Sequence, residues 1–123
     1  MLIEDLYIIE HIEADSKSIR ATLVFNPSHE IFKGHFPEVP VLPGVCMVQC
    51  IKELIETAFD VKSSINKADM IKFLSMLNPV ESNKMHAEII IRDKTESQIV
   101  FQATLKSEEQ FLLKYSGNLL LAQ

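Results

Sequence analysis

The residues with the clearest chemical potential stand close together in the chain, in a loop and at the start of the helix that follows it. His35 lies in the tetrapeptide Gly-His-Phe-Pro, and Pro43-Gly44 precede a run of residues with helical spacing. An imidazole can take up or release a proton near neutral pH because its unperturbed pKa is about 6.5. The amino end of a helix offers unpaired backbone N–H groups and the positive end of its dipole. Together these groups suit proton transfer beside an oxygen that gains negative charge.

A longer motif surrounds these groups. Residues 32–45 read Phe-Lys-Gly-His-Phe-Pro-Glu-Val-Pro-Val-Leu-Pro-Gly-Val. This segment resembles the signature of the bacterial β-hydroxyacyl-acyl-carrier-protein dehydratases, with about nine defining positions at the expected spacing and no gap. Downstream, Ile71-Lys72-Phe73 and Pro79-Val80 look like the family's next strand and the turn after it. The resemblance covers most of the chain from about residue 26 onward.

The resemblance implies both a fold and a reaction. The fold is α+β, a hotdog fold in which an antiparallel β-sheet wraps around one long central helix, with residues 1–123 forming a single domain. The reaction is that of a hydro-lyase, the dehydration of a β-hydroxyacyl thioester of acyl carrier protein or coenzyme A to the trans-2-enoyl thioester. Such a step belongs to the biosynthesis of fatty acids or of related polyenes and lipids. It removes a proton next to the thioester carbonyl, protonates the departing hydroxyl and stabilises an enolate-like oxygen. No cofactor is implied.

The family's pattern also implies a role for each residue of the motif. His35 is the base that removes the proton, and the thioester carbonyl binds at the backbone of Gly44 and Val45. Gly44 has no side chain, so a thioester can approach its backbone closely. Pro40 and Pro43 restrict the loop and hold His35 relative to the helix. The residues expected to line the substrate channel are Phe36, Pro43, Val48 and Phe73.

One position departs from the family's pattern. Fourteen residues after His35 the family has a carboxylate that handles the leaving hydroxyl, whereas this chain has Gln49. A carboxamide can hydrogen-bond to a hydroxyl or orient a water molecule, but it cannot exchange a proton at neutral pH. General acid–base help is worth roughly 10²–10⁴-fold in rate. Two carboxylates are candidate substitutes, Glu53 one helical turn below Gln49 and Glu38 in the loop, although neither has the expected position.

Three functions remain open on these residues. The first is a working dehydratase in which His35 is the base and Gln49 is an impaired partner. The second is a catalytically reduced subunit that binds acyl thioesters or pairs with an active homologue. The third is an acyl thioesterase in which a polar helix residue orients water, a reading that the His-Phe-Pro loop disfavours.

The resemblance also predicts partners. We expect at least a dimer, either a homodimer or a heterodimer with a homologous hotdog subunit, and possibly a higher oligomer, in which the loop of one subunit lies against the helix of the other. An acyl carrier protein is acidic, so its docking requires a local basic patch. The candidate residues for this patch are Lys33, Lys67, Lys72 and Lys84.

A purely structural role is the alternative for the same side chains. His35 could bind backbone carbonyls, and the aromatic side chains could simply pack in the core. Gln49 begins a polar stripe with Lys52, Glu53 and Glu56, which is typical of a solvated or interface face. Cys46 and Cys50 are expected to be free thiols that act as small core or interface residues, because a disulfide between positions four apart would distort a helix.

The elements that position these residues follow from the pattern of residue types. Residues 2–12 and 18–25 are rich in β-branched and apolar side chains and predict a hairpin joined by a turn at 14–17. Residues 26–44 hold four of the five prolines and two of the three glycines, which predicts a long, stiff loop. Residues 45–59 contain no Gly or Pro and carry apolar residues at helical spacing, which predicts the one long helix. The remaining strands are expected at 70–77, 84–92, 98–106 and 111–121.

Composition sets limits on the function. A chain of 123 residues with 47% hydrophobic and 24% charged residues is long enough for one globular core. A net charge of −5 without runs of Lys or Arg disfavours nucleic acid. No long apolar stretch or basic leader is evident, so we expect a soluble cytoplasmic protein. His11, His29 and His86 lack the spacing of metal ligands, so we expect no metal.

Overall fold

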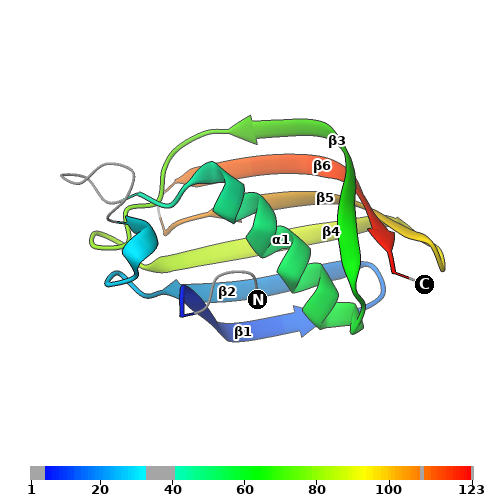
Figure 1. Cartoon of the computed structure of the whole chain (residues 1–123), viewed down its shortest axis with the longest axis horizontal. Coiled ribbons are helices and arrows are strands. Elements are labelled where there is room, and N and C mark those ends of the chain that lie inside the picture. The colour runs from blue at the N-terminus through cyan, green and yellow to red at the C-terminus, as the bar shows by residue number, and fades with distance from the viewer. Residues whose placement is uncertain (1–4, 33–40, 109, 123) are drawn as a thin grey trace.

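The computed structural model describes residues 5–32, 41–108 and 110–122, which form one long helix and six strands. The elements are β1 (Tyr7–Ala14), β2 (Ser18–Phe25), the short 3₁₀ helix η1 (Glu30–Phe32), α1 (Gly44–Phe59), β3 (Ser63–Phe73), β4 (Lys84–Lys94), β5 (Gln98–Lys106) and β6 (Phe111–Leu121). All neighbouring strands are antiparallel, in the order β1-β2-β4-β5-β6-β3. Figure 1 shows α1 lying across one face of this sheet, as the predicted α+β arrangement requires.

The hydrophobic core lies between α1 and the central strands. Alternate residues of β2, β4, β5 and β6 are buried, which is the pattern of strands with one face on the core and one face in solvent. The helix contributes its apolar stripe to the same core. Its buried apolar side chains are Cys46, Met47, Cys50, Ile51, Leu54 and Ile55.

The helix begins and ends at recognisable signals. Pro43 precedes it with an extended backbone, and the first helical residue is Gly44. No Gly or Pro interrupts the following residues up to Phe59. Asp60 then adopts a left-handed conformation with φ 52°, and such a residue commonly closes a helix. The predicted helix is therefore confirmed, with one more residue at its amino end.

The strand after the helix was predicted wrongly at both ends. Residues 70–77 were expected, whereas β3 runs from Ser63 to Phe73 and bulges at two places. Every residue of β3 except Ser63 is exposed, because β3 lies at the sheet edge, where β6 is its only partner strand among the described residues. A strand with two solvated faces does not need alternating apolar residues. The first half of β3 therefore lacks the alternating pattern by which a strand is predicted from sequence. Its bulges accompany the curve of β3 in Figure 1.

The other strands are close to their predicted positions. The hairpin is confirmed, although β1 begins at Tyr7 rather than near residue 2, and β4 extends two residues further than expected. A backbone hydrogen bond of 2.9 Å from Leu42 N–H to the carbonyl of Leu77 ties the segment before α1 to the segment after β3. Among the described residues, no helix is long and apolar enough to cross a membrane.

Candidate active site

A pocket opens at the amino end of α1, between the start of the helix and the end of β3. It encloses about 460 Å³ and is lined mainly by apolar side chains. The predicted residues Pro43, Gly44, Val45 and Phe73 all line it. The others are Val41, Leu42, Met47, Ser75 and Met76. The N–H of Cys46 donates to the carbonyl of Pro43 at 3.0 Å. The N–H groups of Gly44 and Val45 belong to the first turn of α1, where no helical carbonyl lies in position to accept from them. The pocket therefore combines an apolar wall with helix-end donors.

The ring of Phe73 lies very close to Gly44. A Cβ atom at this position would lie 2.6 Å from Cε1 of Phe73, closer than real side-chain contacts allow. The absence of a side chain therefore lets the ring of Phe73 pack directly on the helix start. The ring fills the space that a Cβ atom would take, and the binding of a thioester at the backbone of Gly44 stays a prediction.

Other predicted residues lie outside this pocket. Val48 packs partly buried against the core and is absent from the pocket lining. Gln49 is half-buried and faces a different set of neighbours. His35 and Phe36 lie outside the described residues, as does Glu38, so their predicted roles stay predictions.

Gln49 belongs to a hydrogen-bonded group, here called the helix cluster, with Glu53 and Tyr7. The amide Nε2 of Gln49 donates to Oε2 of Glu53 at 3.0 Å. The hydroxyl of Tyr7, on β1, donates to Oε1 of the same carboxylate at 2.5 Å. Glu53 is only 9% exposed, so its assignment to a solvated face was wrong. Burial is tolerated here because both carboxylate oxygens have donors.

The helix cluster affects the titration of its neighbours. Burial raises the pKa of the Tyr7 phenol, and the hydrogen bond to Glu53 raises it further. Burial likewise raises the pKa of the Cys46 and Cys50 thiols, with the charge of Glu53 adding to the effect. A protonated, buried thiol is a poor nucleophile. The prediction that both cysteines are free core residues is confirmed.

One turn further along, Glu56 joins the helix to β3. It forms an ion pair with Lys52 at 3.1 Å and accepts hydrogen bonds from the backbone N–H and hydroxyl of Ser63. Burial acts to raise the pKa of Glu56, but these donors outweigh it and hold the pKa below its usual value. With 17% of its side chain exposed, Glu56 is not on a solvated face either.

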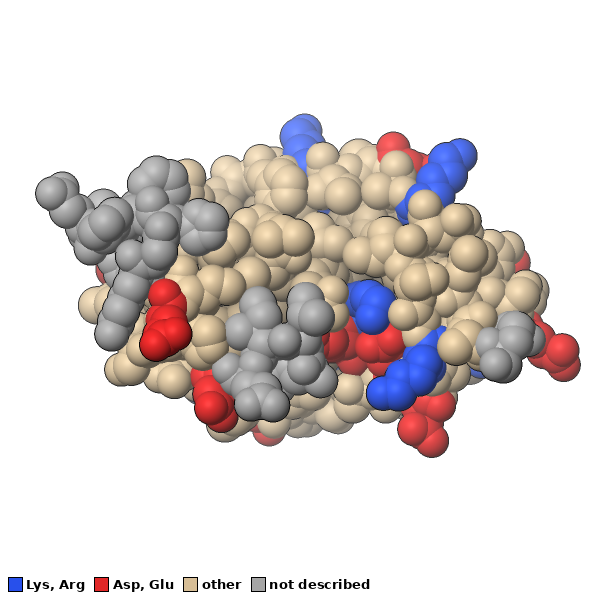
Figure 2. All heavy atoms as spheres, in the orientation of Figure 1, with Lys and Arg blue, Asp and Glu red and all other residues tan. Residues whose placement is uncertain are grey.

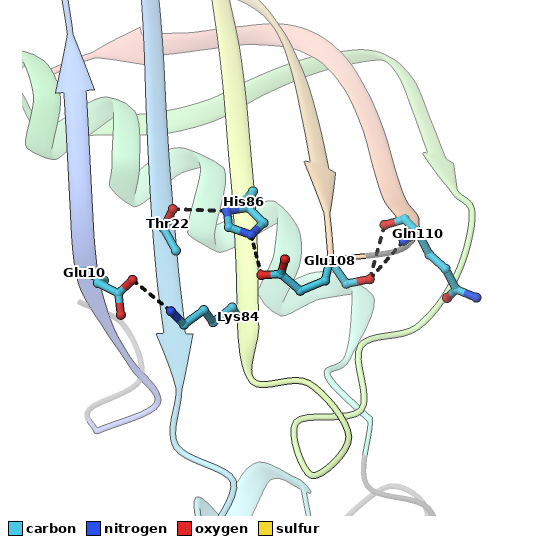
Figure 3. A network of polar contacts seen from close by, with 7 residues as sticks. Glu10, Thr22, Lys84, His86, Glu108 and Gln110 are labelled. Carbon is cyan, nitrogen blue, oxygen red and sulfur yellow. Dashed lines mark hydrogen bonds and ion pairs between the residues drawn. The ribbon is translucent and has the colours of Figure 1, made fainter.

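A second polar group, the sheet cluster, lies on the sheet face that α1 does not cover. Figure 3 shows His86 between Thr22 and Glu108, with Nδ1 3.1 Å from the hydroxyl of Thr22 and Nε2 2.9 Å from a carboxylate oxygen of Glu108. Beside it, Lys84 pairs with Glu10 at 3.2 Å. The hydrogen bond and charge of His86 lower the pKa of Glu108, an exposed residue. This cluster shares no residue with the predicted site.

The predicted basic patch is not formed by its described members. Lys84 is on β4, and three strand spacings, about 14 Å, separate β4 from the edge strand that carries Lys67 and Lys72. Lys67 also lies 3.5 Å from Asp69, and Lys84 pairs with an acidic neighbour. In Figure 2, Lys and Arg are scattered over the face that carries α1. Lys33 lies outside the described residues.

Sequence reasoning missed two parts of this region. Tyr7 is 46 positions from Glu53, so no local pattern could have joined them. Ser75 and Met76 were placed in a strand, whereas they follow β3 and line the pocket. Among residues 5–32, 41–108 and 110–122, no three His, Cys, Asp or Glu side chains are grouped as metal ligands would be.

Comparison with known proteins places the chain in a family. The model of the ApeI-like family, described as ApeI dehydratase, matches residues 11–114. The 3-hydroxyacyl-acyl-carrier-protein dehydratase FabZ of Clostridium kluyveri is 32% identical over 92 residues, 67% of this chain and 61% of that protein. The FabZ of Psychrobacter arcticus is 24% identical over 88 residues, 72% of this chain and 56% of that protein. The chain thus aligns with little more than half the length of these relatives.

Solved structures agree on the fold. The dehydratase heterocomplex ApeI:P from Xenorhabdus doucetiae superposes with a TM-score of 0.73 at 25% identity, over 93% of this chain and 97% of that chain. A hypothetical thioesterase with coenzyme A from Streptococcus pneumoniae gives a TM-score of 0.66 at 10% identity, over 94% of this chain and 85% of that one, a likeness of fold alone. Because the family model spans most of the chain, this protein belongs to the ApeI-like dehydratase family and has a hotdog fold.

Proposed function

We propose that this protein dehydrates β-hydroxyacyl thioesters, carried by acyl carrier protein or coenzyme A, to trans-2-enoyl thioesters. The observation that carries the proposal is the apolar pocket at the amino end of α1, in a chain of the ApeI-like dehydratase family. Backbone donors at Gly44 and Val45 suit an oxygen that gains charge, and the apolar walls suit an acyl chain. A cytoplasmic location stays a prediction.

The reaction can be divided among groups of the site. His35 takes the proton from the carbon next to the thioester carbonyl, and the electrons of that C–H bond form the new carbon–carbon double bond. The C–O bond of the β-hydroxyl breaks, and because Gln49 cannot give up a proton, the leaving oxygen takes one from solvent and departs as water. The helix-end N–H groups of Gly44 and Val45 stabilise the enolate-like oxygen between these events. The group that this chain lacks is an acid to protonate the leaving hydroxyl, because Gln49 stands where the family has a carboxylate.

A specific observation favours a second candidate, a catalytically reduced subunit that pairs with a homologous hotdog protein. Gln49 cannot supply a proton at neutral pH, and both carboxylate oxygens of Glu53 already accept hydrogen bonds. The missing acid would then come from the partner subunit. The structural relative from Xenorhabdus doucetiae is itself described as a dehydratase heterocomplex.

The edge strand β3 suits a partner of this kind. Within the described part of the chain it pairs with β6 on one side only, and an unpaired strand edge is a template for another strand. Large apolar side chains are exposed on β3 and just after it, a feature of association surfaces. They are Ile65, Met70, Ile71, Phe73, Leu74 and Met76. We expect β3 to pair with the equivalent strand of a second hotdog subunit.

Light scattering tests this pairing. Ile71→Asp places a charge on the exposed edge strand and should convert a dimeric mass into a monomeric one. Ile8→Asp is the matched control, because Ile8 is 66% exposed on β1, the strand at the opposite edge. A native protein that is monomeric at micromolar concentration contradicts the proposed pairing.

Mass spectrometry of the acyl group separates the candidate functions. The purified chain is incubated with a β-hydroxyacyl carrier protein, alone and with a copurifying hotdog homologue. Loss of one water by the chain alone supports a complete dehydratase, and loss that needs the homologue supports the reduced subunit. Release of free thiol identifies a thioesterase instead. No reaction in any mixture contradicts the proposal.

An exchange of side chains tests whether only the acid is missing. Gln49→Glu alone would set a second carboxylate beside Glu53, and like charges at this distance cannot both ionise easily. The double variant Gln49→Glu/Glu53→Gln avoids this, because a glutamine at position 53 can still accept from Tyr7 and donate to the new carboxylate. We expect dehydration by the double variant to rise roughly 10²–10⁴-fold, more than with the single change.

A further inference from the structure

We infer that Glu53 is a positioning residue that fixes the orientation of the Gln49 amide, and that the amide oxygen so presented selects thioesters that carry a β-hydroxyl group. The geometry behind this inference is the helix cluster, in which Gln49 and Tyr7 both donate to one buried carboxylate. The inference rests on the proposed function, because it assigns a selectivity to the thioester site.

The carboxylate decides which way the amide points. A glutamine amide can usually be placed with its oxygen and nitrogen exchanged, and only its neighbours distinguish the two orientations. An ionised carboxylate only accepts hydrogen bonds, so the NH₂ of Gln49 must face Glu53. The amide oxygen is therefore turned away from Glu53. The reverse orientation would set two acceptors against each other.

Glu53 is itself held from the other side. The hydroxyl of Tyr7 donates to its second oxygen, and Tyr7 is only 5% exposed. Burial raises the pKa of this phenol, so it keeps its proton and stays a donor. Tyr7 belongs to β1 and Glu53 to α1, so the contact also fixes the helix face against the sheet. The carboxylate has little freedom to release Gln49.

The consequence is a selective acceptor at the predicted catalytic position. Gln49 follows Val45, which lines the pocket, by one helical turn on the same side of α1, so its oxygen can accept a hydrogen bond from a β-hydroxyl group of the substrate. A saturated or enoyl chain has no hydroxyl to donate and leaves that oxygen without a ligand partner. The site should thus prefer β-hydroxyacyl chains and release the enoyl product.

Calorimetric titration with two analogues tests the inference. The probes are the pantetheine amides of 3-hydroxyoctanoic and octanoic acid, in which an amide replaces the thioester and resists turnover. One added hydrogen bond predicts that the native protein, as it assembles in solution, binds the hydroxylated probe roughly 3–10-fold more tightly. In Glu53→Gln the residue can donate or accept, so the Gln49 amide loses its fixed orientation and this ratio should fall toward 1.

Two further variants control the measurement. Glu56→Gln changes another partly buried helix carboxylate that binds Lys52 and Ser63, and it should keep the native ratio. Tyr7→Phe frees Glu53 from the other side and should lower the ratio by less than Glu53→Gln does. It also provides the test if Glu53→Gln fails to fold. An unchanged ratio in whichever of these two folds overturns the inference.

The native protein separates failure of the inference from failure of the proposed function. Equal binding of both probes contradicts the selectivity of Gln49 and leaves a thioester site in place. Binding of neither probe contradicts the thioester site itself, and with it the inference.

Discussion

The helix cluster and the sheet cluster each contain a hydrogen-bonded glutamate, Glu53 and Glu108, but the two side chains differ in their exposure to water. Glu53 is 9% exposed and accepts hydrogen bonds from the protein donors Tyr7 and Gln49. Glu108 has 60% of its side chain exposed and binds His86 at the surface. A buried polar group that loses its partner has no water to replace it, whereas an exposed group does. The two clusters should therefore respond very differently to the same kind of substitution.

The largest effect is expected from Glu53→Leu. This change leaves the buried hydroxyl of Tyr7 and the amide of Gln49 without their acceptor, and should lower the free energy of unfolding by about 3 kcal/mol. Urea unfolding at one fixed protein concentration measures it. A loss no larger than that of a surface substitution would mean that water reaches the helix cluster.

Tyr7→Phe should lower the free energy of unfolding by less, about 2 kcal/mol. Glu53 keeps its hydrogen bond to Gln49 in this variant, so it loses only one donor. The double variant Tyr7→Phe/Glu53→Leu sharpens the test. Replacing both partners by apolar groups leaves no unpaired hydroxyl, so the double variant should lose about 1 kcal/mol less than the two single losses added together. Strict additivity in urea unfolding would contradict a direct bond.

Thr22→Val probes the sheet cluster by the same logic. It removes the hydroxyl that contacts His86, and water can take the place of that hydroxyl at the surface. The free energy of unfolding should therefore change by no more than about 0.5 kcal/mol. A loss of unfolding free energy as large as that of Tyr7→Phe would contradict the expected difference between the buried and the exposed cluster.

Glu108→Gln should have the smallest effect, and one that depends on pH. The pKa of Glu108 is lowered in the folded protein, so its stabilising effect is present above the unfolded value of about 4.5 and is lost as the pH falls through the folded pKa. At pH 7 the variant should thus show a slightly lower urea midpoint than the native protein. Below the folded pKa the two midpoints should coincide, and a gap that widens in acid would contradict the pairing.

The sequence predicted best those elements that face the core on one side. β5 and β6 have the predicted bounds, because their alternate residues are buried and the alternation is visible in the residue types. β3 was misplaced because it is held by pairing with β6 rather than by burial. An alternating apolar pattern arises where one face of a strand is buried. An edge strand with two exposed faces shows little of this pattern, so it is hard to predict from the sequence.

The candidate site shows a similar limit. Residues near in sequence, such as Pro43, Gly44 and Val45, were correctly expected to be together because one helix start positions them. The exposure of Glu53 was predicted wrongly, because helix periodicity alone placed this residue on the solvated side of the helix. Its burial depends on Tyr7, a donor from a distant strand, and hydrogen-bond partners across the fold leave no local signal.

If β3 pairs with a partner subunit as proposed, the ring of Phe73 on Gly44 would link that pairing to substrate access. Phe73 is the last residue of β3, the strand proposed to meet the partner subunit, and it is also a wall of the pocket. A partner that shifts the end of β3 would move this ring across the helix start and widen or narrow the entrance. In the proposed pair the width of the entrance would depend on both subunits, and a different partner would change the chain-length preference without any substitution in this chain.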